Sequence, residues 1–177
     1  MTSPYPLYLL SVDPAASSGW ALWRDARLMS FGTLALVPSG RRRAPSPSRA
    51  VWDWWGATVP PAAAREGSCV LVVESHGARM RNATTAERLI EHRRTWEVVA
   101  ELAGWTVERV LVQTWQAAIL GRGRKGAEKE IAMQVSAAAA KASGMTFPTM
   151  ISEDAADAIC VGRYYLDTAR LRAAQGG

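Results

Sequence analysis

Two short apolar runs that each end at an acid constrain the fold of this chain more than any other feature. Residues 7–13 read LYLLSVD, and residues 68–75 read SCVLVVES. Runs of this length and composition are typical of buried strands. If the two strands are neighbours in one sheet, their ends bring Asp13 and Glu74 close together.

The remaining patterns alternate between strands and helices. Residues 19–24 and 27–36 extend the first run into a three-strand meander, and residues 48–59 have helical spacing. A long helix is predicted over 84–103, with Gly104 as its C-cap, followed by a strand over 106–113. Thr114 is expected to cap a short helix that opens at Trp115. Further helices are predicted over 127–144 and from Ser152 to about Arg172. This order predicts an α/β sandwich around one mixed sheet.

The long helix carries two apolar stripes. A helix with two apolar faces often packs against a sheet with one and against a second subunit with the other. The first stripe comprises Leu89, Trp96, Val99 and Ala103, and the second comprises Ile90, Val98 and Leu102.

Composition limits the class of protein. A chain of 177 residues that is 49% hydrophobic suits one domain over residues 1–177, with a frayed tail from about residue 173. It contains no apolar run of about 18 residues, so we expect no membrane span. Cys69 and Cys160 lie in apolar segments and are interpreted as buried thiols in a reducing compartment. The net charge of +5 suggests a polyanionic partner such as nucleic acid.

The segment ISEDAADAIC places Glu153, Asp154 and Asp157 within five residues, directly after the predicted cap. Acids in the first turn of a helix are favourable to the helix dipole, so capping alone explains each of them. Asp154 and Asp157, at i and i+3, also share one face of the helix. If this pair meets Asp13 and Glu74, four carboxylates repel one another unless cations neutralise them. Hard oxygen ligands favour Mg²⁺ or Mn²⁺, the ions that support phosphodiester hydrolysis in two-metal sites.

Four segments resemble RuvC-type Holliday junction resolvases, which belong to the RNase H-like superfamily. LLSVDPAASSGWAL is similar to their first strand and turn, and VLVVES to their second acidic strand. VQTWQAAILGRGRKGAEKEIAMQV is similar to the segment with their basic loop and functional lysine. EDAADAICVGRYY is similar to their final motif, in which an aspartate pair opens the last helix. The motifs follow the order of the family over nearly the whole chain.

The resemblance implies a five-stranded mixed sheet with helices on both faces, and a homodimer formed through the long helix. It implies catalytic, metal-binding roles for Asp13, Glu74, Asp154 and Asp157, with Mg²⁺ as the cofactor and Mn²⁺ as a substitute. It also implies that Lys129 sits near the scissile phosphate. The structural alternative is an exposed lysine that pairs with a neighbouring glutamate.

The chain also departs from the family. Cellular members carry an aromatic residue shortly after the second acid, and here the stretch is SHGARMRN. His76 stacking on a base, or Met80 acting as an apolar wedge, is one interpretation, and a surface loop is the other. Together with the insertion SGRRRAPSPSR, this departure resembles divergent phage or mobile-element relatives, some of which cut several branched DNAs.

Three basic clusters are candidates for binding the DNA backbone, because phosphate contacts supply affinity with little sequence information. The Arg41 cluster is as readily explained as a solvated loop. Loop 121–126 lacks the P-loop pattern, so no nucleotide cofactor is expected. None of the eight tryptophans is assigned to DNA, and Trp115 is interpreted as a residue at the edge of an element. The basic residues are Arg41, Arg42, Arg43 and Arg49, then Arg79 and Arg81, then Arg122, Arg124 and Lys125.

The leading hypothesis is a Mg²⁺-dependent endonuclease that cuts branched DNA as a dimer, in the cytoplasm of a bacterium or a phage-infected cell. Two alternatives stay open. One is a non-catalytic module on the same fold that binds branched DNA. The other is an RNase H-like nuclease that acts on flaps or RNA–DNA hybrids.

Overall fold

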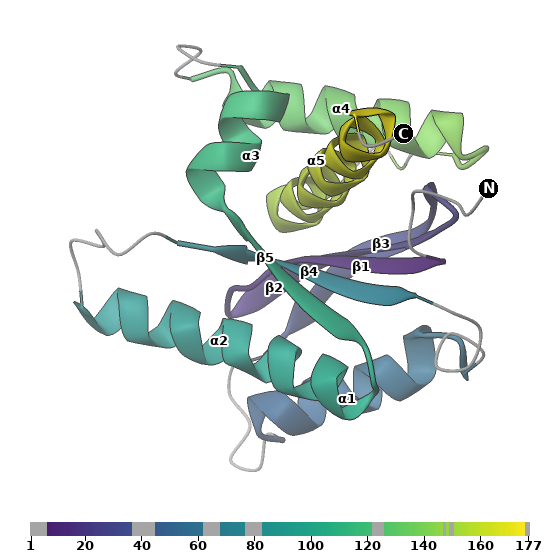
Figure 1. The fold of residues 1–177 in the computed structure, drawn as a ribbon. Coiled ribbons are helices and arrows are strands. Elements are labelled where there is room, and N and C mark those ends of the chain that lie inside the picture. The colour runs from purple at the N-terminus through teal and green to yellow at the C-terminus, as the bar shows by residue number, and fades with distance from the viewer. Residues whose placement is uncertain are drawn as a thin grey trace.

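The computed structural model describes residues 7–36, 45–61, 68–76, 83–121, 126–146, 148 and 151–175. Its centre is a five-stranded sheet in the order β3-β2-β1-β4-β5 (Figure 1). The β1–β2 and β2–β3 pairs are antiparallel, whereas β1–β4 and β4–β5 are parallel. The predicted meander and mixed sheet are confirmed. The strands are β1 (Tyr8–Asp13), β2 (Ser17–Arg24), β3 (Arg27–Ala35), β4 (Cys69–Ser75) and β5 (Thr106–Leu111).

Helices cover both faces of the sheet, which confirms the predicted sandwich. Figure 1 shows α1 (Pro47–Thr58) and α2 (Ala83–Leu102) on one face. The opposite face carries α3 (Val112–Ile119), α4 (Glu128–Ala142) and α5 (Glu153–Gln175). No helix in the described ranges has the length and apolar character needed to cross a membrane.

Side-chain alternation along the strands divides the core into two clusters. Leu9 on β1 and Val72 on β4 belong to the cluster that includes Ile159 of α5. Leu10 and Val73, each one residue further along, belong to the cluster on the α1 and α2 side. Because successive side chains of a strand point to opposite faces, both faces of the central strands are buried. This explains why β1 and β4 are apolar up to their acids, except for Ser11, whose buried hydroxyl is hydrogen-bonded to Ala21 and Trp23.

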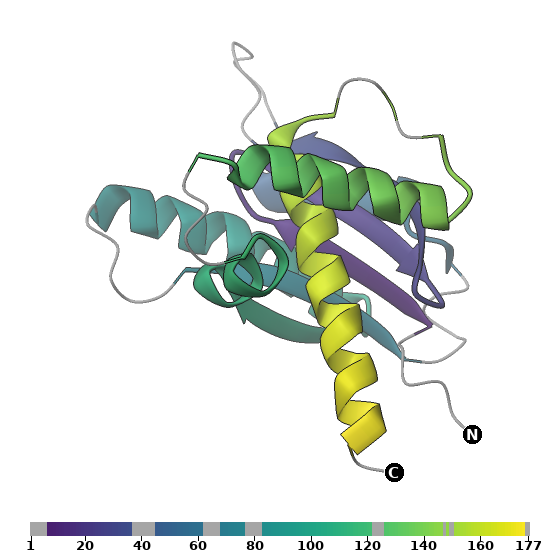
Figure 2. The ribbon, with the colours of Figure 1, turned by 90° about the horizontal axis from the view of Figure 1, so that it is seen from above.

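Two glycines let α5 lie unusually close to the sheet, and Figure 2 shows this helix crossing above the strands. A Cβ atom added to Gly19 on β2 would collide with the backbone carbonyl of Asp154. A Cβ added to Gly162 on α5 would collide with the indole of Trp23 on β2. The close approach of α5 to the sheet therefore depends on the absence of a side chain at both positions.

The structure confirms two of the three predicted helix caps. Ser152 caps α5 as predicted, because the Ala155 N–H donates to its Oγ over 3.1 Å. Gly104, with φ +78°, follows the end of α2 as predicted. The prediction that Thr114 caps a helix opening at Trp115 is wrong, because α3 already begins at Val112. The earlier turn brings Trp115 into the core, where its side chain is fully buried.

Neither Cys69 nor Cys160 forms a disulfide within the described residues, and both are buried, as predicted. On α2, Trp96 and Val99 of the first apolar stripe are buried, whereas Ile90, Val98 and Leu102 of the second are exposed.

Candidate active site

Adjacent parallel strands bring the first two acids together. Val12 of β1 is the register partner of Val73 of β4, so Asp13 and Glu74 are the next residues in neighbouring strands. Ser11, two residues before Asp13, lies against Gly162 of α5. Since alternate residues of a strand share a face, Asp13 also points to the α5 side of the sheet. Glu74 points to the same side, where it contacts α3.

The start of α5 brings the second pair of acids to the same place. Gly19 is the register partner of Asp13, and the backbone of Asp154 lies directly against Gly19. Asp157 follows one helical turn later and faces the same way, because residues at i and i+3 share a face. The close packing of α5 on β2 thus carries Asp154 and Asp157 to the end of β1.

The electrostatics show that the four carboxylates interact. Burial, followed by repulsion from Glu74, Asp157 and Asp154, raises the pKa of Asp13 to about 8. Burial and Asp157 raise the pKa of Glu74 to about 7, against an opposing effect of a hydrogen bond from Trp115. Each proton that these acids retain reduces their mutual repulsion. A cation bound among them would do the same.

The pKa of Asp157 is raised to about 6 by burial and by the neighbouring Asp154 and Glu153, while Lys129 acts in the opposite direction. The set therefore provides hard, mutually repelling carboxylate oxygens, which are the ligands that Mg²⁺ and Mn²⁺ favour. As the side chains stand, no three His, Cys, Asp or Glu residues within the described ranges have the geometry to hold a metal ion. The donor chemistry fits a divalent cation, and binding would require the carboxylates to close around it.

Lys129 lies at the rim of this cluster. Its Nζ is 2.7 Å from a carboxylate oxygen of Glu153, and its side chain is 75% exposed. The structural alternative predicted a pairing with a glutamate, and such a pairing is present. The partner, however, comes from α5 rather than from the same helix. This contact holds the ammonium group near enough to Asp157 to lower the pKa of that acid.

A small cavity of about 100 Å³ opens beside the acids, between α3, α4 and α5. Its charged lining residues are Glu128, Lys129, Glu153 and Asp157, and Leu120 and Met133 are among its apolar ones. The cavity connects the carboxylate cluster with the surface that carries Lys129.

Trp115 is a site residue that the sequence patterns did not reveal. Its indole Nε1 donates a hydrogen bond to Oε2 of Glu74 over 2.7 Å, and its side chain is fully buried. The one available signal was chemical: a buried carboxylate needs a donor, and a buried tryptophan usually finds an acceptor.

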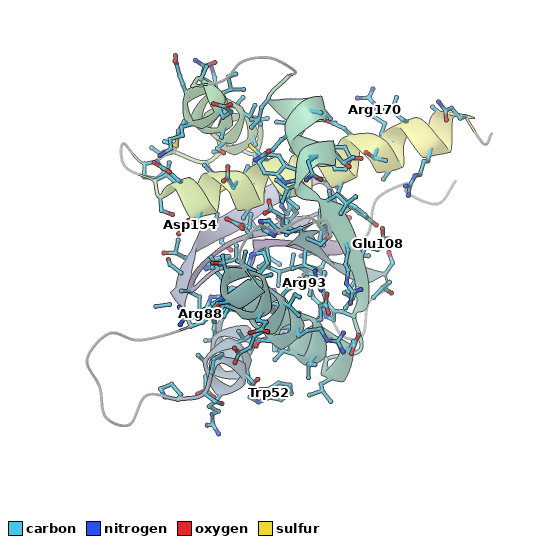
Figure 3. The ribbon with its side chains drawn as sticks, turned by 90° about the vertical axis from the view of Figure 1, so that its left-hand side faces the viewer. Trp52, Arg88, Arg93, Glu108, Asp154 and Arg170 are labelled. Carbon is cyan, nitrogen blue, oxygen red and sulfur yellow. The ribbon has the colours of Figure 1, made fainter. Side chains whose placement is uncertain are left out.

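His76 also belongs to the site. Its Nε2 is 3.7 Å from Oε1 of Glu74. Burial and the nearby Arg93 lower its pKa, so the imidazole is neutral at pH 7. Figure 3 shows Arg88 and Arg93 on α2 on the same side of the molecule as Asp154. Arg93 lies 3.3 Å from Glu97 of the same helix, and the sequence patterns singled out neither arginine.

One residue of the predicted basic clusters lies within the described ranges. Arg49 is described, and it pairs with Asp53 over 2.8 Å on exposed α1. The others lie outside the described residues and stay predictions: Arg41, Arg42, Arg43, Arg79, Met80, Arg81, Arg122, Arg124 and Lys125.

The sheet order, the parallel β1–β4 pair and the helices on both faces define the RNase H-like class of α/β fold. Within this class, the chain has the fold of RuvC Holliday junction resolvases, as the resemblance predicted. It matches "T. thermophilus RuvC in complex with Holliday junction substrate" with a TM-score of 0.63 and 14% identity, over 93% of this chain and 96% of that one. A second structure, of Thermus thermophilus RuvC, gives a TM-score of 0.59 and 17% identity over the same shares. No protein-family model and no curated protein matches the chain.

Proposed function

We propose that this protein is a divalent-metal-dependent endonuclease that hydrolyses phosphodiester bonds in branched DNA, including Holliday junctions. The observation that carries the proposal is the meeting of Asp13, Glu74, Asp154 and Asp157 at the ends of β1 and β4, where burial and repulsion between carboxylates raise the pKa values of Asp13, Glu74 and Asp157. A fold shared with a resolvase that was solved with its junction supports DNA as the substrate. The net charge of +5 is consistent with a polyanionic partner.

The four carboxylates would hold Mg²⁺, with Mn²⁺ as a substitute. When bound, the metal supplies an activated water and stabilises the leaving oxygen of the phosphodiester. Lys129 would turn from Glu153 toward the phosphate and offset the negative charge that develops on it. Because the Lys129–Glu153 pair is exposed, exchanging the carboxylate for a phosphate costs little.

We also infer a homodimer. Ile90, Val98 and Leu102 of α2 are 47%, 40% and 71% exposed, and they lie along one side of the helix. An exposed apolar stripe of this kind marks an interaction surface. A two-fold dimer would present two active sites to a substrate with two-fold symmetry, as two symmetric incisions require.

The function is tested with matched linear, Y-shaped and four-way DNA, in Mg²⁺ or EDTA. We expect Mg²⁺-dependent cleavage of the branched substrates by the wild type and none by Asp13→Asn, with near-normal DNA binding. Asp167→Asn is the matched control, because Asp167 is a half-exposed acid of α5 that pairs with Arg163 and lies outside the cluster. If Asp13→Asn cuts the junction as fast as the wild type, the proposed site is wrong.

The same experiment separates the alternatives. A binding module would retain the branched DNA without cutting it, and its melting temperature would not respond to Mg²⁺ or Mn²⁺. A nuclease for hybrids or flaps would prefer those substrates in direct competition with the four-way junction.

A further inference from the structure

We propose that Trp115 is a positioning residue of the metal centre, whose indole N–H holds the Glu74 carboxylate in the orientation that binds metal. This inference rests on the proposed function. Trp115 Nε1 and Glu74 Oε2 are 2.7 Å apart, a short distance for a nitrogen donor and one typical of hydrogen bonds to charged acceptors. Both side chains are withdrawn from solvent, since Trp115 is fully buried and Glu74 is 6% exposed.

The donor is held rigidly because two elements position it. Glu74 on β4 is the register partner of Val110 on β5, and the chain turns into α3 directly after β5. The turn carries Trp115 over the end of β4, where its ring belongs to the same hydrophobic cluster as Leu120 and Ile159. A ring fixed by packing loses little further freedom when it forms the hydrogen bond, so the bond has a strong orienting effect.

Without a hydrogen-bond donor, the Glu74 carboxylate would not be held in one orientation. It repels Asp13 and Asp157, which favours rotation of its carboxylate away from the cluster. Within the described residues, Glu74 is the one member of the four acids that accepts a hydrogen bond from another side chain. With Oε2 held by the indole, Oε1 is the oxygen that could bind a metal ion, since its neighbour His76 is 3.7 Å away, beyond hydrogen-bond distance. Partners that orient metal ligands in this way typically affect metal affinity or activity about 10- to 100-fold.

Trp115 also fills space, so its orienting role must be separated from packing. Trp96 provides the comparison, because it is fully buried and its Nε1 donates over 3.1 Å to Ser18 Oγ. Its acceptor is a neutral hydroxyl, and its ring belongs to the cluster on the α1 and α2 side of the sheet. Trp96→Phe and Trp115→Phe therefore make the same change in two cores, and only Trp115→Phe removes a donor from the carboxylate cluster.

The experiment measures the Mg²⁺ concentration for half-maximal junction cleavage, and the rise in melting temperature produced by Mg²⁺ without DNA. We expect Trp115→Phe to raise the half-saturating Mg²⁺ concentration about tenfold or more. Its rate should recover substantially in excess Mg²⁺. Trp96→Phe should lower the melting temperature while leaving the metal dependence unchanged. Wild-type metal dependence in a folded Trp115→Phe protein would overturn the inference while leaving the nuclease assignment intact.

If Trp115→Phe does not fold, benzothienylalanine at position 115 replaces the N–H by sulfur and preserves the ring shape. The same increase in half-saturating Mg²⁺ supports the inference, and an unchanged value overturns it. A wild type that neither cleaves DNA nor responds to Mg²⁺ would overturn both the proposed function and this role of Trp115.

Discussion

Gly19 on β2 and Asp154 on α5 are in backbone contact, and this contact determines where the catalytic candidates meet. Gly19 is the register partner of Asp13, so the helix that touches Gly19 necessarily starts beside Asp13. Any side chain at position 19 would collide with the Asp154 carbonyl.

The first prediction follows from this contact. Gly19→Ala should displace the start of α5, destabilise the fold by about 1–3 kcal/mol as overpacking does, and abolish most junction cleavage. Gly56→Ala on α1 is the control, because no atom lies within 4 Å of the added Cβ and alanine favours a helix. Urea denaturation and cleavage assays check both variants. Full activity in Gly19→Ala would mean that α5 does not set the position of its acids.

The second prediction concerns pH. The folded pKa of Asp13 is about 8, above its ordinary value of 3.8, so folding favours the protonated form. The associated stability is fully present below pH 3.8 and is lost as the pH rises toward 8. In EDTA, the melting temperature should therefore decrease as the pH is raised from 6 to 8. Mg²⁺ should raise the melting temperature more at pH 8 than at pH 6.

Thermal denaturation at both pH values, with Mg²⁺ or EDTA, measures this effect. Asp13→Asn should show a smaller fall with pH and a smaller response to Mg²⁺. If Mg²⁺ raises the melting temperature equally at pH 6 and pH 8, protons and metal do not compete for the carboxylates.

The third prediction concerns a charged cluster that links α2 to β5. Glu97 is fully buried, and it accepts hydrogen bonds from Arg94 over 2.9 Å and from Arg109 over 2.7 Å. Burial alone would raise the pKa of Glu97, but these hydrogen bonds outweigh it and lower the pKa. This contribution to stability is present above the ordinary pKa of a glutamate and is lost as the pH falls through the lower value in the folded protein.

Glu97→Gln should therefore cost about 1–2 kcal/mol at pH 7, because it weakens charge-assisted hydrogen bonds to Arg94 and Arg109, whose half-exposed guanidinium groups water can still solvate. Urea denaturation measures the loss, and Glu87→Gln, at an exposed position of the same helix, is the control. A change below about 0.5 kcal/mol, the range of ordinary surface substitutions, would show that the arginines do not depend on Glu97.

The fourth prediction tests the apolar stripe of α2. Val98→Glu places a charge in the centre of the proposed interface, so it should produce a monomer that no longer makes paired incisions. Leu171→Glu, at a residue of α5 that is 62% exposed, should leave the dimer intact. Light scattering after size-exclusion chromatography reports the mass of each variant. A dimeric Val98→Glu protein would place the interface elsewhere.

Much of the fold follows from local patterns in the sequence. The apolar runs before Asp13 and Glu74 predict buried strands, and the first apolar stripe of α2 predicts the side that packs against the sheet, where Trp96 and Val99 are buried. These inferences succeed because burial of both sheet faces, or of one helix face, depends on residues that are close in sequence.

The contacts that complete the site depend on long-range geometry. Trp115 meets Glu74 because β5 gives way to α3 at Val112, earlier than the pattern of residues 106–113 indicated. Lys129 pairs with Glu153 across two helices, and Gly19 matters through the helix that packs against it. In each case the partner is determined by how elements pack, and no spacing within a single element predicts it.

The central claim is that four distant carboxylates bind divalent metal together, and crystals grown with Mn²⁺ test it most directly. Anomalous scattering from Mn²⁺ is predicted to show metal bound between Asp13 and the Asp154/Asp157 pair, with Glu74 as a further ligand. The account would be contradicted if the four side chains are well ordered and turned apart, and no Mn²⁺ is bound between them in crystals that contain Mn²⁺ at millimolar concentration.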